Sequence, residues 1–201
     1  MDLHRQLATF VFALVVTLAC VGIFALLWAF QPSYFPRGAL DAEAGQSEFR
    51  NGWYSSHLHV MGEPILRVEP GVRTYRFTWL RTDHHPVSIR IACANGKAHL
   101  VAVELDGAGG YGPGSIFRRE DIALSASQFA DVDHFVTQSG FFDMDSNERL
   151  LGHDGSRWIV ESVTTKYRVV DRWSPTSGPV REIGLHFLSL AGWTFPEREM
   201  Y

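Results

Sequence analysis

The stretch Arg73–Leu105, RTYRFTWLRTDHHPVSIRIACANGKAHLVAVEL, decides the fold, because hydrophobic and polar residues alternate through most of it. Alternation with a period of two residues is typical of β-strands that bury one face. Asn95 and Gly96 interrupt the pattern with the pair that type I′ turns favour, since both residues accept positive φ angles. The stretch therefore predicts one strand from Arg73 and then a hairpin with the arms Val87–Cys93 and Ala98–Leu105.

Two helices and a second hairpin are expected further along the chain. A capping box at Ser125–Gln128, followed by an apolar stripe at helical spacing, predicts a helix that ends near Gly140. Residues 158–163 and 167–173 alternate as the arms of a hairpin, and residues 179–192 open with proline and repeat at helical spacing. The predicted fold class is α+β, an antiparallel β-sheet of hairpins covered on one face by two α-helices.

The amino-terminal part of the chain contains an uncharged hydrophobic run, LATFVFALVVTLACVGIFALLWAF, at residues 7–30. A helix of this length spans about 36 Å, which exceeds the hydrocarbon core of about 30 Å. We therefore expect one transmembrane helix ahead of the domain; a cleaved signal peptide, the alternative, has a shorter apolar region. The expected boundaries are a tail at 1–6, the transmembrane helix at 7–30, a stalk at 31–48 and a globular domain at 49–201, with a first strand at Trp53–Val60.

These features predict a single-pass signal-anchor protein of the bacterial inner membrane, with the lipid bilayer contacted through residues 7–30 and the domain on the extracytoplasmic side. The formal net charge of −4 provides no basic excess for nucleic-acid binding. The glycine-rich loop Gly107–Gly114 lacks the Gly-Lys-Ser/Thr ending of a phosphate-binding loop and precedes no helix start. We therefore expect neither nucleic acid nor nucleotide as a partner, and no cofactor.

Two pairs of histidines are the candidate metal ligands. His57 and His59 would point the same way on a strand, and His84 and His85 stand before Pro86 in a turn. Imidazoles from both pairs could bind zinc or another divalent cation if the pairs met. No Cys, Asp or Glu stands at a metal-ligand spacing from either pair. The simpler interpretation is that these histidines lie in loops and at strand ends, and no metal is assigned.

Four carboxylates on or beside predicted strands are the candidate acid–base groups: Glu104, Asp106, Glu161 and Asp171. Two of them held about 5–10 Å apart across a cleft could hydrolyse a glycosidic bond. The simpler interpretation is pairing with arginines of neighbouring strands, such as Arg157, Arg168 or Arg172, which needs no function. The stretch 143–154 resembles an EF-hand loop but lacks its glycine and its final glutamate, so calcium is not expected. The catalytic residues stay unassigned.

Four segments resemble an uncharacterised bacterial family of exported or membrane-anchored proteins: TYRFTWLRTDHHPVSIRI at 74–91, ELDGAGGYGPG at 104–114, DGSRWIVESV at 154–163 and YRVVDRWSP at 167–175. The resemblance covers about residues 62–192 and implies an α+β domain. The family has an aromatic residue where this chain has Asp83. It has no assigned activity, cofactor or catalytic residue, so it adds nothing to the mechanism.

Two classes of function remain open. In the first, which we favour, the domain is a binding or interaction module of the cell envelope, and a sheet face or the aromatic-rich segment Trp53–Leu58 contacts another envelope protein. In the second, it is a small envelope hydrolase that uses paired carboxylates or a histidine-bound divalent metal. We favour the first because an enzyme of this size usually displays a recognisable nucleophile or ligand motif, and the sequence displays none.

Overall fold

The computed structural model describes residues 32–40, 44–148, 152 and 154–201, together with the single positions 10, 13, 16 and 17. The chain divides into two compact units, Met1–Pro32 and Ser33–Tyr201, and the second unit is called the domain below. The predicted transmembrane helix at residues 7–30 lies outside the described residues except for those four positions.

No helix among the described residues is long and apolar enough to cross a membrane. This finding corrects the predicted fold class, in which a membrane-spanning helix preceded the domain. The predicted location at the inner membrane and the predicted lipid contact concern residues 7–30 and stay predictions.

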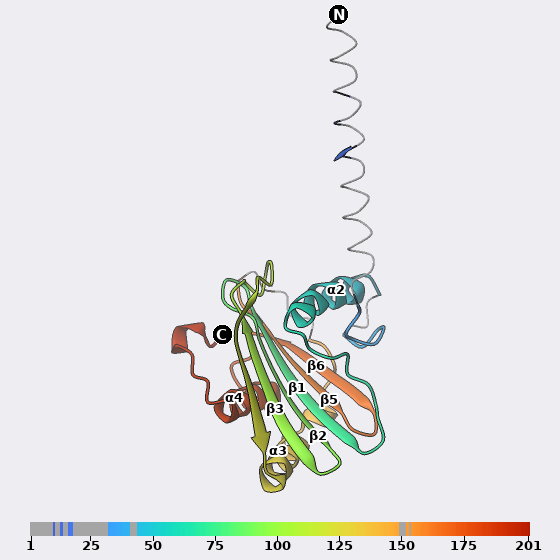
Figure 1. Ribbon diagram of the computed structural model, residues 1–201, viewed down its shortest axis with the longest axis vertical. Coiled ribbons are helices and arrows are strands. Elements are labelled where there is room, and N and C mark those ends of the chain that lie inside the picture. Colours follow the sequence, from blue (N-terminus) through green and yellow to red (C-terminus); the bar gives the residue numbers. More distant parts are fainter. Residues whose placement is uncertain are drawn as a thin grey trace, which may run out of the picture. The chain divides into compact units, whose positions relative to one another are not determined.

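The centre of the domain is a six-stranded antiparallel sheet in the order β4-β3-β2-β1-β5-β6 (Figure 1). Its strands are β1 Val72–Arg81, β2 Val87–Ala94, β3 Lys97–Leu105, β4 Ile116–Leu124, β5 Ser156–Val163 and β6 Tyr167–Trp173. β1 pairs with β2 on one side and with β5 on the other. Asn95 and Gly96 have φ angles of 51° and 75°, as the turn between β2 and β3 requires. The strands predicted from Arg73 onward and both predicted hairpins are therefore confirmed, while β4 was not predicted.

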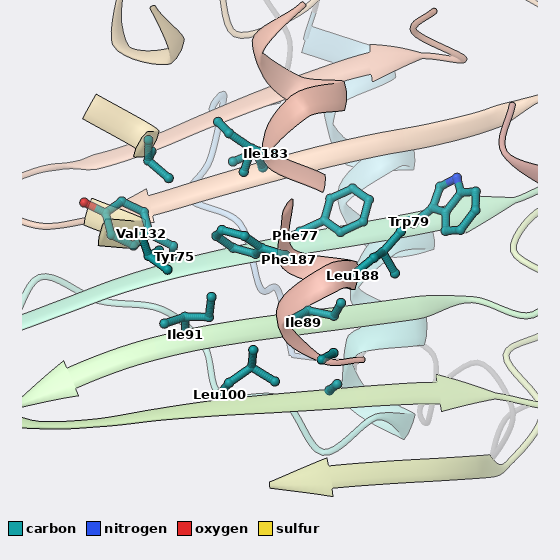
Figure 2. Close-up of a cluster of buried hydrophobic side chains, with 14 of the residues drawn as sticks. Tyr75, Phe77, Trp79, Ile89, Ile91, Leu100, Val132, Ile183, Phe187 and Leu188 are labelled. Carbon is teal, nitrogen blue, oxygen red and sulfur yellow. The ribbon is translucent and has the colours of Figure 1, made fainter. Parts of the chain in front are cut away.

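One face of the sheet is covered by α3 (Ala126–Gln138) and α4 (Pro179–Leu190), together with the short 3-10 turn η1 (Phe141–Asp143). Both halves of the predicted capping box form at the start of α3. Figure 2 shows Phe187 and Leu188 of α4 pointing to the strands that carry Phe77 and Ile89. This core buries one side of nearly the whole sheet, and the two predicted helices are confirmed.

The opposite face of the sheet is covered by α2 (Ala44–Val60), which corrects three predictions. Residues 53–60 are helical instead of a strand, part of the predicted stalk belongs to the domain, and both faces of the sheet are covered instead of one. Tyr54 and Leu58 stand four residues apart and are fully buried against the sheet. Burial of this stripe favours the helix, because positions i and i+4 lie on one helical face. The strand prediction failed because its alternation was local and weak.

Residues at the beginning of the predicted stalk also pack in the hydrophobic core between α2 and the sheet. Tyr34 and Phe35 are 5% and 2% exposed, and Leu40 is fully buried. The backbone N–H of Tyr34 donates to Oγ of Ser55 on α2 at 2.9 Å. The domain therefore begins before residue 49, the predicted boundary.

Candidate functional site

Glu161, one of the four candidate carboxylates, forms a buried ion pair with Arg76, which lies directly opposite on β1. Nε of Arg76 donates to Oε2 at 2.6 Å, and Nη2 donates to Oε1 at 2.8 Å. The Tyr167 hydroxyl donates to Oε1 at 2.9 Å. Burial is the largest single effect and lowers the pKa of Arg76, but the charge and hydrogen bonds of Glu161 together with the charge of Glu63 outweigh it and leave the pKa above its ordinary value. Glu161 is thus an enclosed structural anion.

Asp171 is a second enclosed carboxylate and lies beneath α2. It accepts a hydrogen bond from the Tyr54 hydroxyl at 2.8 Å. Arg50 and Arg157 each bring an Nη1 atom to 3.7 Å from the carboxylate. Burial raises the pKa of Asp171, and the charge of Arg157 opposes that rise. The cluster joins α2 to β5 and β6 and leaves the carboxylate with no exposed surface.

The remaining two candidate carboxylates lie near the loop that joins β3 to β4. Glu104 accepts from Nε of Arg118 at 2.5 Å and lies 3.1 Å from Nδ1 of His85. Asp106 accepts from the backbone N–H of Ser115 at 2.6 Å and closes the base of the loop. Three of the four candidates are therefore paired with arginine, as the sequence indicated. Of the arginines that the sequence indicated, only Arg157 lies against a candidate carboxylate as expected, and the pairs of Glu161 and Asp171 are buried.

The two histidine pairs do not form one donor set. His57 is fully buried, with Nδ1 at 3.1 Å from the carbonyl oxygen of Trp53, whereas His59 is exposed because a helix turns the two side chains apart. Nδ1 of His84 lies 2.7 Å from the hydroxyl of Tyr201, and His85 contacts Glu104. Within the described part of the chain, no group of three or more His, Cys, Asp or Glu residues could hold a metal ion.

The glycine-rich loop between β3 and β4 is tightly held. The backbone N–H of Ala108 donates to the carbonyl of Gly112 at 3.0 Å, and that of Gly109 donates to His84 at 3.1 Å. A Cβ on Gly109 would lie 2.5 Å from the backbone nitrogen of Arg81. Close approach of two backbone segments therefore explains the glycine, and phosphate binding is not needed to explain it.

Three aromatic side chains of α2 and this loop form what we call the aromatic surface: Phe49, Trp53 and Tyr111. Phe49 is 72% exposed and Tyr111 is 70% exposed, while Trp53 is half-buried. The rings of Phe49 and Trp53 have centroids 6.3 Å apart. Nε1 of Trp53 donates to the carbonyl of Gly109 at 2.8 Å and so links α2 to the loop that carries Tyr111. The sequence indicated the segment that contains Trp53 but missed Phe49 and Tyr111.

Two grooves open elsewhere on the domain. One, of about 510 Å³, lies between α3 and α4 and is lined by Asp131, His134, Phe135, Glu182 and His186, among others. The other, of about 300 Å³, lies at the start of α4 beside Arg172 and Glu148. Neither groove is lined by one of the four candidate histidines or the four candidate carboxylates.

No protein-family model matches the chain, and no curated protein is significantly similar to it. The resemblance to an uncharacterised bacterial family therefore stays a prediction.

Proposed function

We propose that the domain is a protein-binding module and that the aromatic surface is its contact site. The observation that carries the proposal is the exposure of Phe49 and Tyr111, at 72% and 70%, on a firmly held support. Large aromatic side chains are enriched at protein–protein contact sites and supply much of their binding energy. An exposed aromatic cluster costs solubility when it has no partner, so it favours a binding role.

The support beneath the aromatic surface favours binding without a large ordering cost. Trp53 is held by its bond to Gly109 and by ring contact with Tyr54, whose centroid lies 5.0 Å away. The backbone N–H of Tyr111 donates to the carbonyl of Ala108 at 3.0 Å within the loop. Because the Trp53 side chain and the backbone that carries Tyr111 are already positioned in the free protein, less conformational entropy is lost when a partner binds.

The burial and ion pairing of two candidate carboxylates favour this proposal over the hydrolase alternative. Glu161 and Asp171 have no exposed side-chain surface, and each lies against arginine. A general acid or base must reach a substrate proton within hydrogen-bond distance, directly or through a water molecule. Enclosed, ion-paired carboxylates are suited to holding strands and α2 together.

Site-specific photo-crosslinking in cells that naturally produce the protein tests the proposal. A benzophenone amino acid is placed at Phe49 or at Tyr111 of the full chain, and at Lys166 as a control. Lys166 is exposed in the turn between β5 and β6, far along the strands from the glycine-rich loop. We expect one protein adduct of the same mass from positions 49 and 111, and none from position 166.

A second arm tests whether the aromatic side chains themselves bind. Phe49→Ser in the chain that carries the probe at position 111 is expected to reduce the adduct at least about fivefold, because hot-spot aromatics dominate affinity. Leu185→Ser is the matched control, since Leu185 is a 38% exposed apolar residue of α4. Equal adducts at all three probe positions, or an adduct that Phe49→Ser leaves unchanged, would contradict the proposed contact site.

A further inference from the structure

The strand β4 is a free edge of the sheet. It is nine residues long, and among the described strands it pairs with β3 alone. The other edge, β6, is covered in part, because the backbone N–H of Asp171 donates to the carbonyl of Ser146 at 2.8 Å. A free edge presents unpaired N–H and C=O groups that can accept another strand.

The usual protections of a free edge are few on β4. The strand contains no proline or lysine, and its only register shift lies at its start, opposite Glu104 and Leu105. Two large apolar residues at that end are exposed, Ile116 at 47% and Phe117 at 61%. Natural edges are commonly short, bulged, covered, interrupted by proline or lined with charged side chains. Of these protections β4 has the bulge at its start and its four charged residues, so a partner strand must match those charges.

The charges of β4 are divided between its two halves. Its sequence is IFRREDIAL, in which two arginines are followed directly by two acidic residues. Antiparallel pairing of β4 with a second copy reverses one strand against the other, so the basic half of each strand faces the acidic half of its neighbour. Opposite charges on facing positions stabilise an antiparallel pair, whereas like charges destabilise it. The strand is therefore complementary to itself.

We propose that two copies of this chain associate through antiparallel pairing of β4 with β4, with Glu120 at the two-fold axis. When two identical strands pair antiparallel about a two-fold axis, the residue at the axis lies opposite the same residue of the other copy. With Glu120 there, Arg119 of each copy faces Asp121 of the other, and Phe117 faces Ala123. Arg118, which lies diagonally across the pair, is already bound to Glu104, so the repulsion between the two Glu120 side chains is opposed by the attraction of the two Arg119–Asp121 pairs.

The proposed interface is independent of the aromatic surface. The aromatic surface uses α2 and the tip of the β3–β4 loop, whereas the interface uses the outer side of β4. Reversal of one strand against the other places the two aromatic surfaces at opposite ends of the joined sheets, where both remain accessible. Either proposal can therefore fail without the other.

Disulfide trapping tests the register in the full chain with Cys20 and Cys93 replaced by serine. Glu120→Cys places two cysteines directly opposite at the axis, within the Cα separation of about 7 Å that a disulfide tolerates. Ala123→Cys, on the same exposed strand, is the control. Its two copies stand six residues apart along the strands, about 20 Å, so they cannot react within the dimer. We expect mild oxidation to give a covalent dimer at least about tenfold faster with Glu120→Cys.

Charge reversal tests the pairing in the chain without added cysteines, by sedimentation over a range of concentrations. Arg119→Asp or Asp121→Arg alone is expected to weaken the dimer on the order of tenfold, since two attractive pairs become repulsive. Arg119→Asp combined with Asp121→Arg is expected to restore it, because the charges have exchanged places. Equal oxidation rates for Glu120→Cys and Ala123→Cys, or a double variant as weak as the single ones, would overturn the proposal.

Discussion

The Arg76–Glu161 pair is the contact whose loss we expect to destabilise the domain most, because neither side chain has exposed surface. Glu161→Gln keeps the shape of the side chain but removes the charge that neutralises Arg76. Removing one partner of a buried ion pair costs about 3–5 kcal/mol. We expect the free energy of unfolding to fall by about 4 kcal/mol, because Glu63, 3.5 Å from Nη1 of Arg76, offsets only part of the lost charge.

Urea denaturation followed by tryptophan fluorescence measures this loss, because Trp79 and Trp158 are fully buried in the core. With a slope of about 2 kcal/mol per molar urea, the midpoint is expected to fall by about 2 M. Glu69→Gln is the matched control, since Glu69 is an exposed residue of the loop before β1, and its midpoint should stay unchanged.

A double variant tests the reason for the loss. Arg76→Met together with Glu161→Gln removes both charges, and Glu63 keeps Arg90, whose Nε lies 3.0 Å away, as its partner. We therefore expect the double variant to be more stable than Glu161→Gln alone. The reasoning is refuted if Glu161→Gln lowers the midpoint by less than about 0.5 M, or if the double variant is the less stable of the two.

Two further predictions concern glycines and pH. Gly184→Ala in α4 should lower the stability by about 1–3 kcal/mol, because its Cβ would lie 2.7 Å from Cζ of Phe77. A Cβ on Gly52 in α2 would have no neighbour within 4 Å, so Gly52→Ala should raise the stability by about 0.5–1 kcal/mol. Equal effects of the two substitutions on the urea midpoint would contradict this reasoning. Burial lowers the pKa of His57 below its ordinary value of 6.5, so the unfolded chain binds the proton more readily. Stability should therefore fall as pH drops below about 6.5, and His57→Gln should make the urea midpoint less dependent on pH between 7.5 and 5.5.

The candidate site was only partly predictable, because its residues gain their roles from distant partners. The sequence indicated Trp53 as part of an aromatic segment, yet nothing local distinguishes Phe49 or Tyr111 from a core residue. Their exposure follows from the way α2 and the glycine-rich loop lie against the sheet. Likewise, Glu161 meets Arg76 through strand register, which sequence spacing alone does not determine.

The sequence by itself determined the elements whose signals are local. Alternation in residues 73–105, the Asn95–Gly96 turn, the capping box at Ser125 and the proline that begins α4 each act within a few residues. Only the tertiary structure decided the state of α2 and β4, whose residues carry mixed or charged patterns. α2 is helical because a helix buries Tyr54 and Leu58 against the sheet, and β4 is a strand because it pairs with β3. Both elements are stabilised by contacts with residues far away in the sequence, and a local sequence pattern carries no information about such contacts.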